Sequence, residues 1–313
     1  MRLFRLISIV SITRRFQRLL LTSNQSITFQ MSDRKRLLGP VNAKLPAVGI
    51  SSDLNNKPTK VDKKRNDEVR KMFLKSGLVT NANGSAYLEV GDTIIEVSVF
   101  GPRPIRGSFI DRASFSVECK FLPYVTQPNE ITFNGKATNF NNNGRPSLTN
   151  IEQKISSYLE TSLLPCILLE KYPKSTIDIF VSVISTNSNP NSNSSLLNLI
   201  NWIINCSSLA LVDSGIELKD IVTSGQVNLN QKSNELTLDP IYPVDTIDNE
   251  DSIDCLVSFM NLRNDEIVGF WVEGKQEELN ETIITQLIDG CNEMSKQIRS
   301  NINGYLLSLM DSN

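Results

Sequence analysis

The sequence contains no histidine in its 313 residues. This absence excludes nucleophilic catalysis by Ser-His-Asp or Cys-His groups, and it excludes zinc or iron sites that use histidine ligands. Any reaction carried out by this chain would have to use carboxylates, lysine, tyrosine, thiols or the phosphate of a bound substrate.

Cysteine is scarce and scattered. The five cysteines lie dozens of residues apart and form no CxxC pair, so the sequence offers no thiolate metal site. Their neighbours are mostly apolar, which is typical of small buried thiols in a reducing compartment. We therefore expect an intracellular protein without a metal or other cofactor. The five residues are Cys119, Cys166, Cys206, Cys255 and Cys291.

Acidic residues are missing from the first 31 positions, which carry five arginines. Removing these arginines leaves 27 basic residues against 34 acidic residues, a net charge of −7 instead of −2. An Arg-rich segment with Ser and Thr is typical of a mitochondrial transit peptide, but it is too interrupted by charge to span a bilayer. The alternative, which we favour, is that translation begins at Met31 and that residues 1–30 are an upstream basic leader.

The remainder divides into two regions. Residues 31–76 are polar and basic without periodicity, which indicates an N-terminal arm and a flexible linker. Residues 77–313 carry the patterns of a folded domain. Strands with alternating apolar residues flank turn pairs at Asn83-Gly84 and Gly91-Asp92. The order strands, helix, strand, helix, strands, helix predicts an α+β sandwich.

Two helices of this domain have clear sequence signals. Thr149 and Glu152 have the spacing of a capping box, and the apolar stripe that follows them ends near Pro165. A strongly apolar helix runs from about 196 to 213 and is closed by Gly215. Trp202 lies in the middle of this helix, where core packing is the expected role.

Several stretches of this domain resemble the RNase PH family. The resemblance covers about residues 77–310 and rests on the order and spacing of the pieces. They are Asn83-Gly84-Ser85-Ala86, Val99-Phe100-Gly101-Pro102-Arg103, the strand from Tyr172 to Val181, and Leu209 to Ile216. The resemblance implies an RNase PH-like fold, related to ribosomal protein S5 domain 2, with mixed and antiparallel sheets and helices.

Three further stretches narrow the resemblance to RNA exosome ring subunits of the fungal mRNA-transport-regulator type. They are Ser32 to Pro40, Gly101 to Phe109, and Ile267-Val268-Gly269-Phe270-Trp271. The resemblance implies one of six RNase PH-like subunits in a ring that passes RNA through its central channel. Its implied partners are the other ring subunits, RNA-binding cap subunits and an associated hydrolytic exoribonuclease.

The same resemblance implies a role in rRNA processing, RNA surveillance and mRNA turnover, in the nucleus, nucleolus and cytoplasm, with no membrane attachment. Such ring subunits are generally catalytically inert in eukaryotes. We therefore expect a non-catalytic structural subunit. The alternatives are an active phosphate-dependent 3′–5′ exoribonuclease and, if residues 1–30 are a targeting segment, a mitochondrial RNA-processing factor.

The phosphate-binding position argues against catalysis. Phosphorolysis must hold a phosphate nucleophile beside the scissile phosphodiester, which requires arginines and backbone N–H groups at a helix N-terminus. In active family members a Gly-rich turn after the central strand, with an arginine nearby, supplies this cradle. Here residues 186–195 take its place, and they contain no glycine, arginine or lysine.

The acidic side of the site is ambiguous. Asp239 resembles the family's first catalytic aspartate, and Asp251 with Asp254 resembles its second acidic cluster; Asp245 also has a suitable offset. An active enzyme would use Asp239 and one acid between Asp245 and Asp254. Clustered carboxylates could also bind a divalent cation, although a solvated acidic loop is the simpler interpretation. We expect a vestigial acidic site without metal.

Three arginines are the candidates for RNA contacts. Arg103 and Arg106 lie on a loop bounded by Gly and Pro, and Arg112 follows it. Guanidinium groups on a loop can bind phosphate in a bidentate manner, and in family members this loop faces the channel. The alternative is that one or more of these arginines pairs with a carboxylate of an adjacent subunit.

Overall fold

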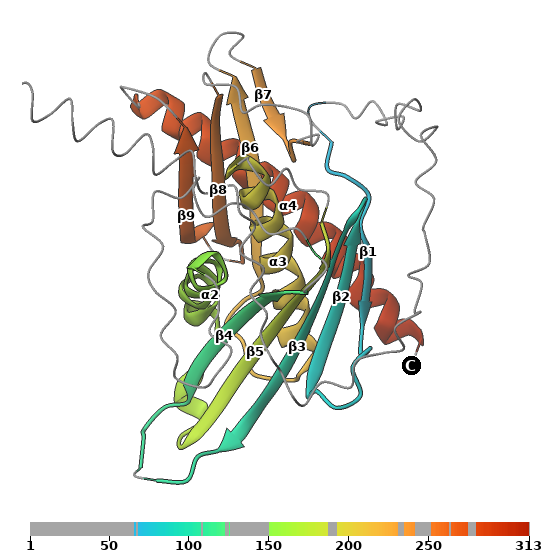
Figure 1. Cartoon of the computed structure of the whole chain (residues 1–313), viewed down its shortest axis with the longest axis vertical. Coiled ribbons are helices and arrows are strands. Elements are labelled where there is room, and N and C mark those ends of the chain that lie inside the picture. Colours follow the sequence, from blue (N-terminus) through green and yellow to red (C-terminus); the bar gives the residue numbers. More distant parts are fainter. Residues whose placement is uncertain are drawn as a thin grey trace, which may run out of the picture. The chain divides into compact units, whose positions relative to one another are not determined.

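The computed structural model describes residues 66, 68–107, 109–122, 125, 150–186, 193–230, 235–241, 252–262, 264–274 and 280–312. All of them belong to one unit, Val61–Asn313, which is shown in Figure 1. The strands are β1 (Phe73–Ser76), β2 (Gly84–Val90), β3 (Thr93–Pro104), β4 (Ser114–Phe121), β5 (Ser175–Ser185), β6 (Val222–Asn230), β7 (Glu235–Leu238), β8 (Ser252–Met260) and β9 (Glu266–Gly274). The helices are α2 (Asn150–Leu163), α3 (Asn193–Asp213) and α4 (Glu281–Ser312), with short 3-10 turns at Leu164–Cys166 and Leu169–Lys171.

The first sheet has five strands in the order β1-β2-β3-β5-β4. The predicted hairpin of β2 and β3 is confirmed, and its alternating apolar residues are buried on one face. Strand β4 runs parallel to β5, whereas the other pairs are antiparallel. Strands β1, β2 and β3 therefore form an antiparallel meander at one side of the sheet.

The second sheet has four antiparallel strands in the order β7-β6-β8-β9. Strands β6 and β8 lie in its middle and are almost wholly buried. Strand β9 forms one edge and is far more exposed than its neighbour β8. This sheet carries Asp254 on β8, and Asp239 directly follows β7.

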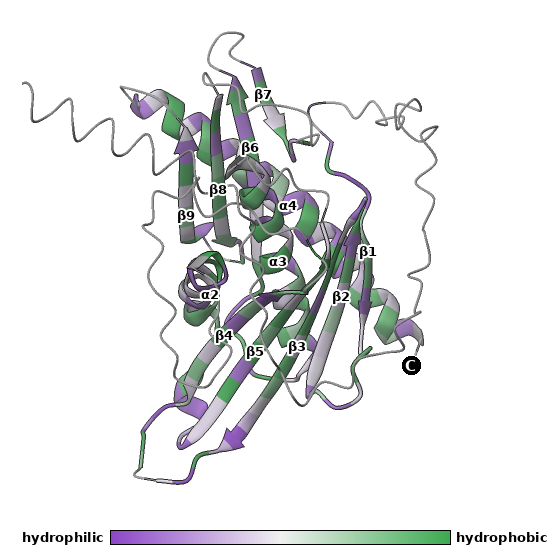
Figure 2. Cartoon of the chain, in the orientation of Figure 1, coloured by the Kyte–Doolittle hydropathy of each residue, from purple (hydrophilic) through white to green (hydrophobic). Residues whose placement is uncertain are grey.

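The helices fill and cover the sheets. Helix α3 lies between the two sheets and contacts β2 and β3 on one side and β6 and β8 on the other. This position explains why α3 is apolar around most of its circumference, as Figure 2 shows. It is also the one described helix long and apolar enough to cross a membrane, yet nearly all of it is buried inside the fold. Helix α4 covers the other face of the four-stranded sheet, and α2 packs on β4 and β9.

Several sequence predictions can be compared with this architecture. The α+β composition with two sheets is confirmed. All five cysteines are free and buried, and Trp202 is fully buried, as expected. Strand β1 pairs with β2 over Phe73–Ser76, so the first strand of this sheet precedes residue 77.

Glu152 of the predicted capping box makes a contact outside α2. Its carboxylate accepts the backbone N–H of Phe121 at 2.9 Å, so it joins α2 to the end of β4. Both residues are buried, so without Glu152 the backbone N–H of Phe121 would lack a hydrogen-bond partner and could not bind water instead. Thr149 lies outside the described residues.

Candidate functional site

Asp239 follows β7, and its carboxylate binds the side chain of Arg70, which precedes β1 in the sequence. The Nε and the backbone N–H of Arg70 donate to Oδ2 at 2.8 and 3.0 Å, and Nη2 donates to Oδ1 at 2.7 Å. The carboxylate is fully buried, whereas the Arg70 side chain is 20% exposed. A side-on guanidinium with two parallel hydrogen bonds is the strongest common partner of a carboxylate.

Buried amides complete this network. Asn198 of α3 donates to Oδ1 of Asp239 at 3.1 Å and to Oε1 of Gln226 at 2.8 Å, and it accepts a bond from Nη2 of Arg70 at 2.7 Å. The guanidinium also lies 5.7 Å from the ring centre of Trp202, within the range of a cation–π contact. The chain therefore surrounds the Asp239 carboxylate with its own donors.

The segment before β1 is fixed to the site by its backbone as well. The N–H of Leu238 donates to the carbonyl of Asn66 at 2.9 Å, and the N–H of Asp239 donates to the carbonyl of Gln226 at 3.1 Å. Asp239 adopts a positive φ of 47°, which a short polar side chain tolerates better than most residues. These bonds place residues 66–70 against the end of β7.

Asp254 lies in the middle of the same sheet. It is 2% exposed on β8, and its Oδ1 accepts a hydrogen bond from Nδ2 of Asn228 at 2.9 Å. Asn228 and Gln226 are two residues apart on β6 and so lie on one face, about 7 Å apart along the strand. Asp239 at the end of β7 and Asp254 on β8 thus lie on opposite sides of β6, which separates them.

Two of the predicted acids cannot be compared with the structure. Asp245 and Asp251 lie outside the described residues. Among the residues that are described, no group of three or more acids or cysteines is placed to hold a metal ion. Each described acid of the predicted cluster is instead bonded to a side chain of this chain.

The helix that begins at the expected phosphate position is α3. Its first residues, Asn193, Ser194 and Ser195, contribute no cation, and Ser195 is buried. A helix N-terminus favours an anion through its unpaired N–H groups, but without an arginine or lysine the attraction is weak. The described part of residues 186–195 therefore fits the sequence interpretation that the cradle lacks its charge.

Arg103 is engaged within its own sheet. At the end of β3, its Nη2 donates to Oδ2 of Asp178 on β5 at 2.7 Å, and its guanidinium lies 5.4 Å from the ring centre of Phe100. Ser116 of β4 donates to the other oxygen of Asp178 at 2.7 Å. The partner carboxylate comes from this chain. About half of the Arg103 side chain is still exposed.

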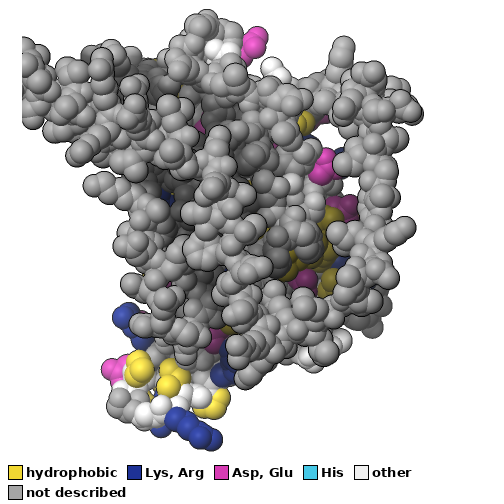
Figure 3. Space-filling model, in the orientation of Figure 1, with side chains coloured by type: hydrophobic (Ala, Val, Ile, Leu, Met, Phe, Trp, Pro, Cys, Tyr) yellow, Lys and Arg dark blue, Asp and Glu magenta, His cyan; other side chains and the backbone are white. Residues whose placement is uncertain are grey.

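Arg106 and Arg112 lie on the loop from β3 to β4, and both are exposed. Within the described residues neither forms an ion pair. Backbone bonds hold both ends of the loop: Ile105 donates to Lys174 and Ala113 donates to Leu169, each at 3.0 Å. Figure 3 shows cationic and hydrophobic side chains gathered at the lower end of the molecule, where this loop lies. The structure thus presents these two arginines on an anchored projection.

Phe109 and Ile110 accompany the arginines on this loop and are 70% and 42% exposed. Sequence reasoning did not select them. It also missed Arg70, Asn198 and Gln226. A polar stripe of Asn198, Asn201 and Asn205 in an otherwise apolar helix is the signal that could have revealed a buried polar network.

Comparison of the sequence with known proteins shows the family to which this chain is related. Residues 68–217 match the family described as the 3′ exoribonuclease family, domain 1, or RNase PH. The exosome complex component mtr3 of Schizosaccharomyces pombe is 32% identical over 215 residues, which cover 68% of this chain and 73% of that protein. The chain belongs to the RNase PH family.

Other comparisons show similarity over most of the chain. The exosome complex component MTR3 of Chaetomium thermophilum is 26% identical over 277 residues, covering 83% of this chain and 92% of that protein. Rice Rrp46 has a similar fold, with a TM-score of 0.60 at 20% identity over 79% of this chain and 99% of its own. A chain of the Archaeoglobus fulgidus exosome with RNA bound to the active site has a TM-score of 0.57 at 16% identity, over 77% and 91% of the two chains. The predicted RNase PH-like fold is confirmed.

Proposed function

We propose that this chain is a non-catalytic structural subunit of the RNA exosome core ring, which supports 3′–5′ processing and degradation of RNA. Its similarity to proteins named exosome complex component MTR3, along most of the chain, supports the exosome assignment. The RNase PH-like fold supports a place in the ring. The residues of the acidic site support the absence of catalysis.

The observation that carries the non-catalytic assignment is the Arg70–Asp239 contact. A catalytic carboxylate must be free to bind a metal ion or to accept a proton from the reacting groups. Here both oxygens of Asp239 accept hydrogen bonds from Arg70, and the carboxylate is fully buried. A substrate would have to displace the chain's own guanidinium before it could reach this acid.

The phosphate side leads to the same conclusion. Phosphorolysis brings two anions together, and this requires cations close to the reacting phosphorus. Residues 186–195 provide none. Asp245 and Asp251 are the other acids of the predicted vestigial site. We include them because they lie in the same acidic stretch of the sequence as Asp254.

We assign the projecting arginines to RNA. Arg106 and Arg112 are exposed on an anchored loop, and Arg103, whose side chain is half exposed and paired with Asp178, lies at its base. Contacts of this kind bind the phosphate backbone without reading the sequence. A domain with net negative charge needs such a local concentration of cations to guide RNA.

The partners in this proposal are the other RNase PH-like ring subunits, RNA-binding cap subunits and an associated hydrolytic exoribonuclease. RNA passes through the central channel to that nuclease. The expected locations are the nucleus, the nucleolus and the cytoplasm, where RNA is processed and degraded. No metal or other cofactor takes part in the action of this chain.

A phosphorolysis assay tests the proposal. The purified chain, alone and together with its copurifying partners, is incubated with labelled RNA and inorganic phosphate, and released nucleoside diphosphates are measured. We expect no release by the lone chain above a blank without protein. Release that disappears in an Asp239→Asn variant would show an active enzyme. An active RNase PH in the same buffer is the positive control.

A further inference from the structure

The loop between β3 and β4 exposes an aromatic side chain. Phe109 is 70% exposed, the largest exposed fraction of any aromatic residue in the described part of the chain. Ile110 beside it is 42% exposed. Two adjacent apolar side chains in water are stabilised only when a ligand or partner covers them. The loop therefore offers a surface that a bound molecule can cover.

Backbone hydrogen bonds fix the position of this aromatic ring. The N–H of Lys174 donates to the carbonyl of Ile110 at 2.9 Å, and the N–H of Ile105 donates to the carbonyl of Lys174 at 3.0 Å. Phe109 therefore lies one residue away from an anchored peptide unit. A group that is already held in place loses little conformational freedom when it binds a ligand.

The same two bonds bring a further cation to the loop. Lys174 directly precedes β5, is exposed and has a positive φ of 55°. We call Lys174 and the described residues of 105–113 the β3–β4 projection. It carries three exposed cations, Arg106, Arg112 and Lys174, against one acid, Asp111. Figure 3 shows cationic and hydrophobic side chains together at this end of the molecule.

This mixture of side chains is typical of a site for single-stranded nucleic acid. Cations bind the phosphates of such a strand, and aromatic rings stack on its bases. In a duplex the faces of the bases are already stacked on one another, so an aromatic side chain cannot reach them. An exposed ring among cations therefore favours a single strand over a duplex.

Two other exposed aromatic residues lie in a less suitable setting. Phe73 on β1 is directly opposite Glu89, and Phe180 on β5 is directly opposite Glu118. Each of these rings also meets a second ring of the chain edge to face, with 6.3 and 5.6 Å between centres. A neighbouring carboxylate repels the phosphates of a strand that would stack there.

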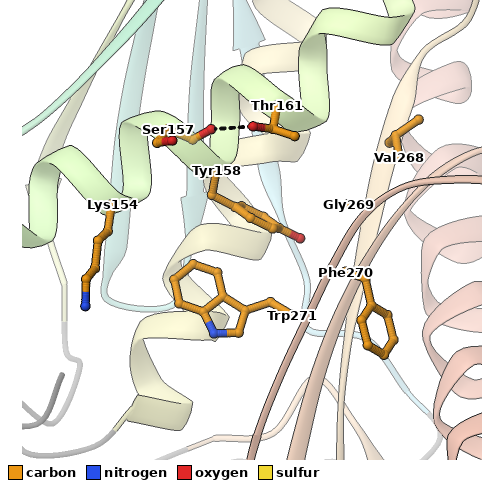
Figure 4. Close-up of a pocket in the computed structure, with 8 residues that line it drawn as sticks. All are labelled: Lys154, Ser157, Tyr158, Thr161, Val268, Gly269, Phe270 and Trp271. Atoms are coloured by element: carbon orange, nitrogen blue, oxygen red, sulfur yellow. Dashed lines mark hydrogen bonds between the residues drawn. The ribbon is translucent and has the colours of Figure 1, made fainter. Parts of the chain in front are cut away.

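The groove between α2 and β9, about 440 Å³ in volume and shown in Figure 4, also contains exposed aromatic surface. Its indole, Trp271, meets the ring of Tyr158 at 5.2 Å between centres. The Nε1 of Trp271 donates to Oε1 of Glu273 at 3.0 Å. This ring is thus engaged within the chain and lies beside an acid, whereas Phe109 lies among cations.

We propose that Phe109 stacks on a base of single-stranded RNA, while Lys174 binds a phosphate of the same strand. The inference rests on the proposed function, which brings RNA to the β3–β4 projection in the assembled ring. Stacking of this kind tolerates any sequence, because every base has an aromatic face. It adds an uncharged contribution to the binding by the arginines.

Fluorescence anisotropy of the assembled ring with a labelled oligoadenylate tests the two roles separately. Phe109→Ala should weaken binding by roughly fivefold to a hundredfold and leave the salt dependence unchanged. Phe109→Trp should keep the affinity, and Phe109→Leu should lose it. Lys174→Ala should make the slope of log affinity against log salt shallower by about 0.7. Phe73→Ala and Lys75→Ala, two exposed sites on β1, are the matched controls and should change neither value.

A labelled strand of the same length without bases gives a second readout. The wild-type ring and the Phe109→Ala ring should bind this abasic strand equally. Oligoadenylate binding that is unchanged in Phe109→Ala, or an equal loss on both strands, would overturn the stacking role. Loss of this chain from the ring in Phe109→Ala, seen by native mass spectrometry, would show a protein contact and overturn the choice of RNA. Failure of the wild-type ring to bind RNA would instead contradict the proposed function.

Discussion

Arg70 and Asp239 lie 169 residues apart in the sequence, and the guanidinium of one donates to both carboxylate oxygens of the other. The contact joins the segment before the first strand to the end of β7. It gives this segment a structural role, and it occupies the acid that the family resemblance assigns to the first catalytic position.

Replacing Arg70 by methionine should strongly destabilise the protein. The change leaves the Asp239 carboxylate fully buried without its cation, and breaking one side of a buried pair costs about 3–5 kcal/mol. Urea denaturation of the wild-type and Arg70→Met proteins measures the difference in the free energy of unfolding. A double variant with Asp239→Asn should recover part of the loss, because the buried charge is then gone.

Arg103→Met is the matched control for that experiment. Its ion pair with Asp178 has the same 2.7 Å length, but 53% of the Arg103 side chain is exposed. Water screens such a pair, so the loss should be less than about 1 kcal/mol. Equal losses in the two variants would contradict the structural role of Arg70.

Replacing Arg103, Arg106 and Arg112 together by alanine should weaken RNA binding by the assembled ring. If all three touch phosphate, the slope of log affinity against log salt should become shallower by about 2, since each contact to a single strand contributes about 0.7. Fluorescence anisotropy with a labelled single-stranded RNA at several salt concentrations gives both values. An equal triple change at Lys75, Lys120 and Lys296, which are exposed on other surfaces, should leave the slope unchanged.

Two glycine-to-alanine substitutions should change the free energy of unfolding in opposite directions. In Gly84→Ala the new Cβ would lie 2.3 Å from the backbone nitrogen of Ser214, so β2 and the end of α3 must separate at a cost of about 1–3 kcal/mol. In Gly304→Ala the Cβ meets nothing within 4 Å on helix α4, and the gain in helix propensity is about 1 kcal/mol. Thermal unfolding of both variants checks the signs, and a stable Gly84→Ala would show that the close approach is wrong.

Stability should fall in alkaline solution. Burial raises the pKa of Cys166 to about 12, and burial likewise raises the pKa of Cys119 and Cys206. The folded thiols stay protonated while the unfolded chain ionises from about pH 8.5 upward, so stability is complete below that pH and decreases above it. Each raised thiol contributes a loss of about 1.4 kcal/mol per pH unit in this range.

The measurement for this prediction is the urea midpoint between pH 7 and 10.5, together with the rate of reaction with a thiol reagent. Cys166→Ala should show a flatter pH dependence than the wild type. All five thiols should be unreactive until the protein unfolds, because all are buried. Rapid labelling of the native protein would contradict this account.

The sequence predicted the local elements well because their signals are local. The β2–β3 hairpin follows from its turn residues and alternation, and α3 follows from its apolar length. The parallel pairing of β4 with β5 could not be predicted, since residues 114–121 alternate in the same way in a parallel or an antiparallel sheet. The arginine loop could be located from its sequence, but the pairing of Arg103 with Asp178 depends on strand register.

In the acidic site, too, the sequence predicted individual residues but not their tertiary contacts. Asp239 and Asp254 could be selected from their sequence neighbourhood, and the structure places both in the four-stranded sheet, on either side of β6. The partner of Asp239 could not be found in this way, because Arg70 lies in a polar segment that was interpreted as a flexible linker. The role of Arg70 depends on its contact with Asp239, 169 residues away in the sequence, and no local pattern encodes this contact.

The most direct test of the central claim combines assembly with chemistry. The tagged chain is purified from its own organism and examined by native mass spectrometry, and the same material is assayed for phosphate-dependent release of nucleoside diphosphates. The account predicts one copy of this chain with five related RNase PH-like chains, and no phosphorolysis by the chain alone. A free chain that releases nucleoside diphosphates, and loses this activity in Asp239→Asn, would contradict it.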